Sequence, residues 1–185
     1  MRGTAPRSYA RSVVEIRSLN ASEAQAYAGD LAEILLDCVA GGASVGFMPS
    51  LAKDTAEAFF EKAAASIEQG ERLLFVAFAD SRLVGTVQLI PATMPNQPHR
   101  ADIAKLLVHR SARGRGIANS LMQQAEEAAL VSGKTLLVLD TCEGGDAERL
   151  YLRRGWTKAG VIPNYALFPD GSPCDTAIFW KQLLP

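Results

Sequence analysis

The stretch that decides the fold runs from Ile103 to Val131 and opens with the sequence IAKLLVHRSARGRG at positions 103–116. Its first six residues form an aliphatic run that is short enough to be a buried strand of a central sheet. After Gly116, apolar residues recur at helical spacing: Ile117, Leu121, Ala125 and Ala128. The pattern therefore predicts a strand, a glycine-rich turn and a helix, in that order.

A turn of this kind predicts an anion site. The first amides of the helix lack partners, and the positive end of the helix dipole lies beside the arginines of the turn. The ligand expected at such a site is a phosphate group. The turn is not a P-loop, because no Gly-Lys-Ser/Thr closes it, and it is not a dinucleotide fingerprint, because Gly114 and Gly116 lack a third glycine in register.

Length and composition restrict the classes of protein. The 185 residues predict one domain, at 13–185, behind a flexible polar tail at 1–12. A net charge of -1 argues against a nucleic-acid partner, and no apolar run is long enough to span a bilayer. The start of the chain has no apolar signal segment, and three cysteines at no metal spacing suit a reducing compartment. We therefore expect a cytoplasmic protein without a metal site.

The rest of the chain alternates strand and helix patterns. A helix capped by Asn20 or Ser22 is expected to continue through Cys38, and Asp54 or Thr55 is expected to cap the next helix. A later helix is expected at 147–154, capped by Asp146. The remaining strands are expected at 13–17, 73–78, 83–90, 135–139, from 161, and at 175–180, with a tight hairpin turn at 79–82.

The segment from Gly41 to Pro49 combines glycines with apolar side chains that look exposed. One interpretation is a helix–helix connection packed onto the core, which the pattern alone slightly favours. The other is a wall over a substrate pocket, which Phe47 and Met48 would line together with Tyr165.

The sequence from Arg113 to Ala118 fits the pattern Gln/Arg-x-x-Gly-x-Gly/Ala and resembles the acetyl-CoA pyrophosphate loop of the GNAT superfamily of N-acetyltransferases. The resemblance implies a mixed α/β (α+β) fold, with a mostly antiparallel twisted sheet of about seven strands flanked by helices. It also implies that loop amides bind the pyrophosphate, while the preceding strand offers backbone groups to the pantetheine arm and an N–H to the oxyanion. The cofactor-binding residues expected on this basis are Leu106, Leu107, Val108, Arg113, Gly114, Arg115, Gly116, Ile117, Ala118, Asn119 and Thr141.

A second segment, from Ala147 to Trp156, is similar to the GNAT signature in which a tyrosine reaches the sulfur of CoA. The runs at 41–48 and 111–116, the pair Asp140-Thr141 and the turn at 169–171 narrow the resemblance to the tabtoxin-resistance type of GNAT enzyme. In that type an aspartate and a tyrosine form the active site. They correspond here to Asp140 and Tyr151.

Acetyl transfer to an amine requires a neutral amine, a stabilised oxyanion and a proton for the departing thiolate. Tyr151 suits the last task, whereas Asp140 could deprotonate the amine or simply hold it. Cys142 could carry an acetyl group, but direct attack on acetyl-CoA is simpler. The two histidines, His99 and His109, have no Ser or Cys partner in an obvious triad.

These observations predict an acyltransferase that moves an acetyl group from acetyl-CoA to a primary amine of a small molecule, either tabtoxin-like, antibiotic-like or amino-acid-like. The alternative is a catalytically silent CoA-binding sensor or structural module. The expected partner is the small amine, with no nucleic acid and no membrane, and a homodimer is left open.

Overall fold

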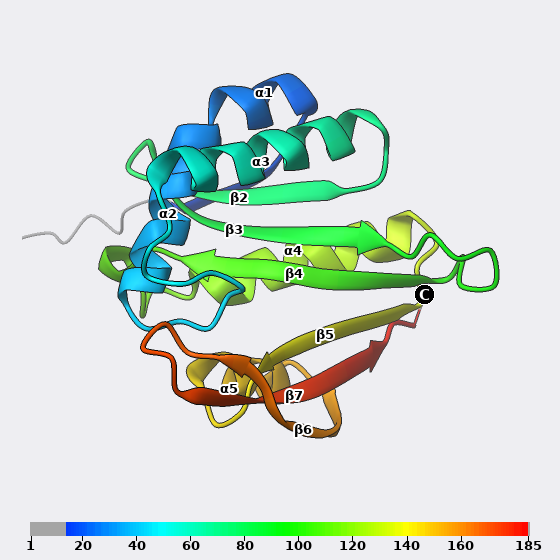
Figure 1. The fold of residues 1–185 in the computed structure, drawn as a ribbon. Coiled ribbons are helices and arrows are strands. Elements are labelled where there is room, and N and C mark those ends of the chain that lie inside the picture. The colour runs from blue at the N-terminus through cyan, green and yellow to red at the C-terminus, as the bar shows by residue number, and fades with distance from the viewer. Residues whose placement is uncertain (1–13, 185) are drawn as a thin grey trace, which may run out of the picture.

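The computed structural model describes residues 14–184, whose seven strands form one sheet in the order β1-β2-β3-β4-β5-β7-β6 (Figure 1). All neighbouring strands run antiparallel except β4 and β5. The predicted mixed fold is thereby confirmed, whereas the predicted tail lies outside the described residues. In chain order the elements are β1 (Val14–Leu19), α1 (Ala21–Ala26), α2 (Ala28–Ala40), α3 (Lys53–Glu68), β2 (Leu73–Ala79), β3 (Arg82–Pro91), β4 (Arg100–Val108), the 3-10 turn η1 (Arg110–Ala112), α4 (Ile117–Val131), β5 (Leu136–Cys142), α5 (Asp146–Arg153), β6 (Thr157–Leu167) and β7 (Pro173–Gln182).

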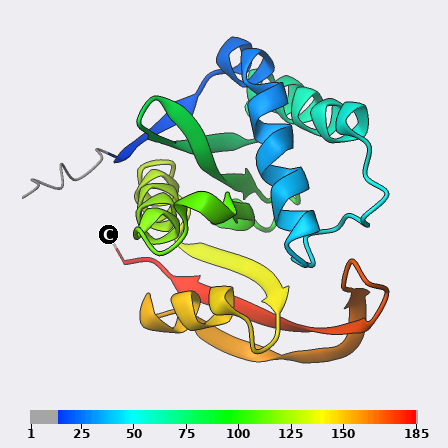
Figure 2. The ribbon, with the colours of Figure 1, turned by 90° about the vertical axis from the view of Figure 1, so that its left-hand side faces the viewer.

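Helices cover the sheet on both faces. In Figures 1 and 2, α1, α2 and α3 lie over one face of β1 to β4, and α4 and α5 lie over the other face. Each face has its own core, because side chains of a strand alternate between the faces. Leu74 and Val76 of β2 pack with the first three helices, and Phe75 and Ala77 pack on the side of α4. None of the described helices is long and apolar enough to cross a membrane.

The sheet opens between β4 and β5. Only Arg100, Ala101 and Asp102 pair with β5, opposite Leu136 to Val138. Beyond Asp102 the edge of β4 that faces β5 has no partner strand, although its other edge stays paired with β3. The two halves of the sheet therefore separate towards the carboxyl ends of β4 and β5 (Figure 2).

A bulge lies in β4 at the start of this opening. Thr86 pairs with Leu107 and Gln88 pairs with Ala104, so that Lys105 and Leu106 together oppose one residue of β3. Lys105 takes a left-handed backbone conformation with φ of 51°. A bulge of this kind bends a strand and redirects its side chains, so β4 is not the regular strand that the sequence predicts.

Several predicted element ends were wrong. The first predicted helix is two helices, α1 and α2, that meet at Tyr27, and Asn20 caps α1 through a capping box with Glu23. Ala52 is the N-cap of α3, so Asp54 lies in the first turn. Its negative charge interacts favourably with the positive end of the helix dipole, but its side chain does not cap the helix. Likewise Asp146 begins α5 instead of capping it. The hairpin turn at 79–82 is confirmed, with Asp80 and Ser81 at positive φ.

Candidate active site at the opening between β4 and β5

The glycine turn places unpaired amides at the start of α4. Gly114 and Gly116 have φ of 75° and 77°, and no neighbouring atom lies close to where a side chain would begin at either one. No side chain caps the helix at Gly116, and the first intrahelical acceptor is its carbonyl, bonded by the amide of Ser120 at 3.1 Å. The amides of Ile117, Ala118 and Asn119 therefore begin the helix without helical partners. This geometry fits a phosphate group.

The side chain of Arg113 is turned back towards the protein. Its Nε donates to the carbonyl oxygen of Val108 at 3.1 Å, and its guanidinium contacts the sulfur of Cys38 at 3.7 Å. Asp37 braces the same region, because its carboxylate accepts from the backbone N–H and the Nε of Arg110, at 2.8 and 2.9 Å. Arg113 thus ties the turn to β4 and α2, a role that the sequence pattern alone did not suggest.

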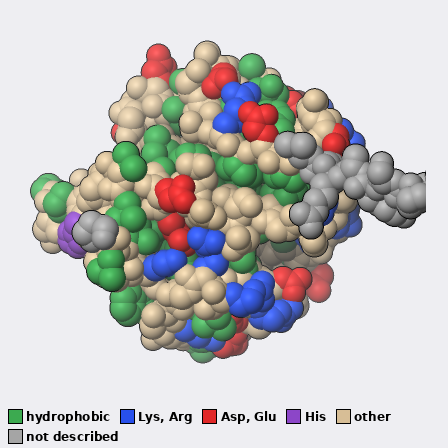
Figure 3. All heavy atoms as spheres, turned by 180° about the vertical axis from the view of Figure 1, so that it is seen from behind, with side chains coloured by type: hydrophobic (Ala, Val, Ile, Leu, Met, Phe, Trp, Pro, Cys, Tyr) green, Lys and Arg blue, Asp and Glu red, His purple; other side chains and the backbone are tan. Residues whose placement is uncertain are grey.

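Asn119 is held by a buried network on the far side of α4. Its side-chain oxygen accepts from Arg154 at 2.7 Å, and Arg154 also donates to Glu126. Glu126 further accepts from Trp156 at 2.9 Å and from Lys181 at 2.9 Å. Figure 3 shows Lys and Arg side chains beside Asp and Glu side chains on the face that α4 and α5 cover. The start of α4 is therefore fixed to the end of α5 and to β7.

We predict that Gly116→Val raises the KM for acetyl-CoA by at least about 10-fold. A Val side chain would enter the space in front of the amides, and a β-branched residue is strained at positive φ. Steady-state kinetics with acetyl-CoA as the varied substrate measures this effect.

Gly133→Val is the matched control for that variant. Gly133 also has positive φ, at 75°, and open space around it, but it follows the other end of α4. The control should show a similar loss of stability and an unchanged KM. Equal KM values for the Gly116 and Gly133 variants, both folded, would remove the turn from the cofactor site.

The other predicted cofactor residues lie along the opening. Leu106, Leu107 and Val108 form the part of β4 that follows the last pair with β5. Thr141 lies on β5, also beyond that pair. The structure therefore brings both strands' free edges to the place where an extended chain could run between them.

Tyr151 is buried on α5, with 5% of its surface exposed. Its ring packs against Trp156 and Phe179, at 5.9 and 6.0 Å between ring centroids. Burial raises the pKa of Tyr151 well above its ordinary value, and the negative charge of Asp140 adds to this shift. The phenol therefore stays protonated across the physiological pH range and can donate a proton or a hydrogen bond.

Asp140 lies near the end of β5, with its side chain on the face of the sheet opposite to α4 and α5. Leu137 and Leu139 point into the core beneath α4 and α5, so the exposed Asp140 points towards the side of α1 to α3. Among the hydrogen bonds between described residues, none joins Asp140 to Tyr151. The charge of Asp140 raises the pKa of Tyr151, but the two side chains are not hydrogen-bonded to each other.

Phe47 and Met48 lie on the connection between α2 and α3. Phe47 packs edge-on against Phe59 of α3, at 5.3 Å between ring centroids, and Met48 is exposed. The connection also reaches the far end of the chain, because Ser44 Oγ donates to the carbonyl oxygen of Leu167 at 2.9 Å. Tyr165, on the same strand as Leu167, is exposed. Phe47 therefore packs against the core, as the connection interpretation expects, and Met48 lies on the surface, while the wall over a substrate pocket stays a prediction.

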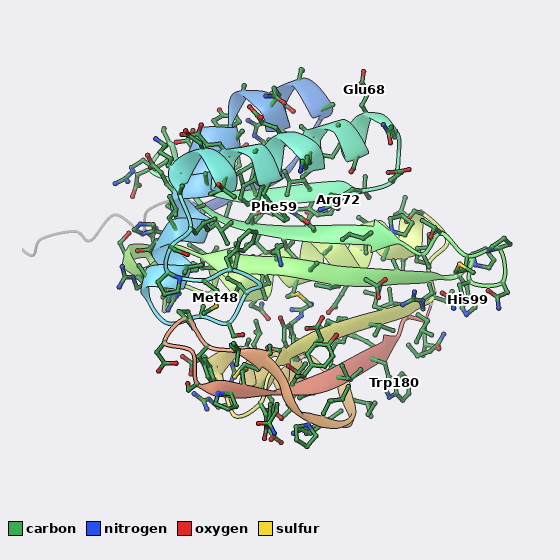
Figure 4. All side chains as sticks on the ribbon, viewed as in Figure 1. Met48, Phe59, Glu68, Arg72, His99 and Trp180 are labelled. Carbon is green, nitrogen blue, oxygen red and sulfur yellow. The ribbon has the colours of Figure 1, made fainter. Side chains whose placement is uncertain are left out.

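Lys105 is the residue that the sequence analysis missed. It reads as one polar position in an aliphatic strand, but the bulge turns it towards α3. Its Nζ donates to the carbonyl oxygen of Val45 at 3.0 Å and lies 5.8 and 5.7 Å from the ring centroids of Phe47 and Phe59. Figure 4 shows Phe59 and Arg72 under α3 on this side of the sheet and Met48 on the connection below. The only sequence signal was a lysine within an apolar run.

Cys142 is not a thiolate nucleophile, and His109 lies between Ser111 and Asp37, whose carboxylate is 3.5 Å from its Nε2. Burial, together with the neighbouring thiol of Cys174, raises the pKa of Cys142 to about 12, so its thiol is protonated at neutral pH. His109 does contact a serine, contrary to expectation, since its Nδ1 lies 2.8 Å from Ser111 Oγ. The same nitrogen accepts from the Ser111 amide, so this contact caps η1. Within residues 14–184, no group of His, Cys, Asp or Glu could hold a metal ion.

Comparison with known proteins agrees with this geometry. The model of the acetyltransferase (GNAT) family matches residues 35–156. An uncharacterized N-acetyltransferase from the hisH–hisA intergenic region of Azospirillum brasilense is 30% identical over 132 residues, which cover 70% of this chain and 77% of that protein.

Solved structures share the fold at lower identity. An N-acetyltransferase from Staphylococcus aureus Mu50 has a TM-score of 0.78 at 20% identity, over 94% of this chain and 100% of the other. The structure of yncA from Salmonella typhimurium, solved with its cofactor acetyl-CoA, has a TM-score of 0.75 at 19% identity, over 92% and 94%. The fold is thus shared with solved acetyltransferase structures, and the extent of the family match establishes that this chain belongs to the GNAT family of acetyltransferases.

Proposed function

We propose that this protein transfers the acetyl group of acetyl-CoA to a primary amine of a small molecule by direct attack of the amine. The observation that carries the proposal is the alignment of three features along one opening: the uncapped start of α4, the free edges of β4 and β5, and the pair Tyr151 and Asp140 at its end. The solved relative that holds acetyl-CoA supports the choice of cofactor.

The groups that would hold acetyl-CoA follow from this alignment. The amides of residues 114–119 would bind the pyrophosphate, and the backbone of Leu106, Leu107 and Val108 would bind the pantetheine arm, with Thr141 on the facing strand. The cofactor supplies an activated acetyl group as a thioester. A backbone N–H near Leu107 or Val108 would stabilise the oxyanion that develops on its carbonyl.

Tyr151 and Asp140 would divide the proton transfers. Tyr151, kept neutral by its raised pKa, would donate towards the departing sulfur. Asp140 would hold the amine or accept its proton on the other face of β5. The raised pKa of Cys142 supports direct attack, because a protonated thiol is a poor acetyl carrier.

We further propose a small polar acceptor of the tabtoxin-like, antibiotic-like or amino-acid-like kind, used in the cytoplasm by an enzyme of the tabtoxin-resistance type. Phe47, Met48 and Tyr165 would wall its site. The hydrogen bond from Ser44 to Leu167 supports this placement, because it holds the connection after α2 beside the end of β6. A ligand-bound structure with the acceptor away from all three residues would contradict it.

Calorimetry with acetyl-CoA, followed by a transfer assay on a panel of amines, tests the function. We expect binding at micromolar concentration and release of free CoA that depends on an amine. No binding at that concentration would refute the cofactor. Binding without turnover of any amine would identify a sensor instead of an enzyme.

Asp140→Asn is expected to lower the kcat/KM for the acceptor by about 10- to 100-fold, because the variant keeps the size of the side chain and removes its charge. The loss should shrink at high pH only if deprotonation is the main role, since more of the amine is then already neutral. Asp80→Asn, in an exposed hairpin turn that tolerates asparagine, is the control. A full kcat/KM in Asp140→Asn would remove Asp140 from the reaction.

A further inference from the structure

A cluster of donors on the α3 side of the sheet has no acidic partner. Lys105 of β4 and Arg72, just before β2, are both partly buried, and neither forms an ion pair with any residue between 14 and 184. Arg72 donates to the side-chain oxygen of Gln88, and Lys105 donates to a backbone carbonyl. Neither positive charge therefore has a compensating carboxylate in contact among the described residues.

Buried polar atoms without partners lie on the same face of the sheet, one of them on Arg72 itself. Gln88 and Thr86 are fully buried, and alternate positions of β3 place both on the face of α3. Gln88 Nε2, Thr86 Oγ1 and Arg72 Nε have no hydrogen-bond partner among the described residues. A buried donor without a partner destabilises the fold, so a cluster of them indicates a missing acceptor.

The backbone under Lys105 supports a role for its side chain. A residue other than glycine at φ of 51° is strained, and here it lies in the middle of a strand. Glycine would adopt this conformation at lower cost. The lysine is also held in one place by Val45 and by the rings of Phe47 and Phe59. A strained and immobilised cation beside the acceptor site is typical of a ligand contact.

Asp140 supplies the opposite charge at the same opening. It is exposed and lies on the same face of the sheet as Lys105. Burial lowers the pKa of Lys105, and the negative charge of Asp140 offsets part of that shift. A ligand that spans the two would meet a negative charge at one end and positive charges at the other. A zwitterion has the matching arrangement.

We infer that the acceptor is an acidic amine, whose carboxylate or similar oxyanion is bound by Lys105 and Arg72 while its amino group lies at Asp140. This inference rests on the proposed function and narrows it to amino acids and amines with a phosphonate or phosphinate group. It disfavours polyamines and aminoglycosides, because their added positive charges would be repelled by Lys105 and Arg72.

Matched pairs of acceptors test the inference. Each amino acid is compared with its α-carboxamide, glutamate with glutamine, aspartate with asparagine, and 2-aminoethylphosphonate with ethanolamine. We expect the acid of the best pair to have a kcat/KM about 10- to 100-fold higher, as for a hydrogen bond to a charged group. The carboxylate and phosphonate pairs identify which oxyanion is bound.

Variants separate recognition from structure. Lys105→Met should lower kcat/KM for the acid, mainly through KM, and leave the amide nearly unchanged, so that the preference within the pair collapses. Lys105→Arg should restore part of it, and Arg72→Met should reduce it. Lys62→Met, on the exposed face of α3, is the control and should change neither rate. A purely structural lysine would lower the rates for acid and amide alike.

Acetyl-CoA binding, measured in the same preparations, distinguishes a failure of the proposed function from a failure of the inference about the acceptor. If no acetyl-CoA binds, the proposed function itself fails. If acetyl-CoA binds but the amide or a polyamine is preferred, or no acidic acceptor is acetylated, the inference is overturned and the cofactor assignment stands. An unchanged acid-to-amide ratio in Lys105→Met would also overturn it.

Discussion

Tyr151→Phe is expected to lower kcat by about 10²- to 10⁴-fold while leaving the Kd for acetyl-CoA nearly unchanged. The substitution removes one hydroxyl and keeps the ring, which packs against Trp156 and Phe179. The fold should therefore survive. The large effect is expected because burial raises the pKa of this phenol and keeps its proton available for the departing sulfur at neutral pH. Pre-steady-state kinetics and calorimetry measure the two quantities separately.

Tyr27→Phe is the matched control for this prediction. Tyr27 lies at the junction of α1 and α2, where its ring packs edge-on against Phe78. It loses the same hydroxyl far from the opening, and its kcat should equal that of the unaltered protein. If Tyr151→Phe keeps full kcat with every acceptor tested, the acid is not Tyr151, and solvent or the amine's own proton must reach the thiolate.

Glu126→Ala is expected to lower the free energy of unfolding by about 3 to 5 kcal/mol, the usual cost of removing one partner from a buried ion pair. Glu126 is 8% exposed and accepts hydrogen bonds from Arg154, Trp156 and Lys181. Its removal would leave the indole N–H without its acceptor and would remove the only carboxylate that Arg154 and Lys181 contact among the described residues. Urea unfolding measures the loss, and the exposed neighbour Glu127→Ala should change stability by less than about 0.5 kcal/mol.

The same network predicts a dependence of stability on pH. Burial alone would raise the pKa of Glu126, but hydrogen bonds from Arg154, Lys181 and Trp156 outweigh it and lower the pKa. A carboxylate with a lowered pKa in the folded state stabilises the fold above its unfolded pKa of about 4.3. This stabilisation is lost as the pH falls through the folded pKa, and the loss should be absent in Glu126→Ala. Parallel acid sensitivity in both proteins would contradict the assignment.

The sequence by itself determined the architecture and the strand, turn and helix on which the candidate site is built. The aliphatic run, the RGRG turn and the helical spacing after it predict β4 and α4 because these signals are local. The resemblance predicted Asp140 and Tyr151 as active-site residues, and the structure has Asp140 near the end of β5 and Tyr151 on α5, without a hydrogen bond between them among the described residues. Capping was less predictable. Asp54 and Asp146 stabilise the first turns of their helices without capping them, which spacing alone does not distinguish.

Only the tertiary structure decided which side chains face the opening and which brace it. The bulge that turns Lys105 towards α3 arises from the pairing of β4 with β3. The local sequence of β4 does not determine the register of that pairing. Arg72, just before β2, bonds to Gln88 of β3 on the same face, and Glu126 meets Lys181 across 55 positions of the chain. The pattern of Arg113 suggested a ligand contact, yet its guanidinium bonds to β4. Contacts between residues so distant in sequence depend on the packed fold, and local propensity carries no information about them.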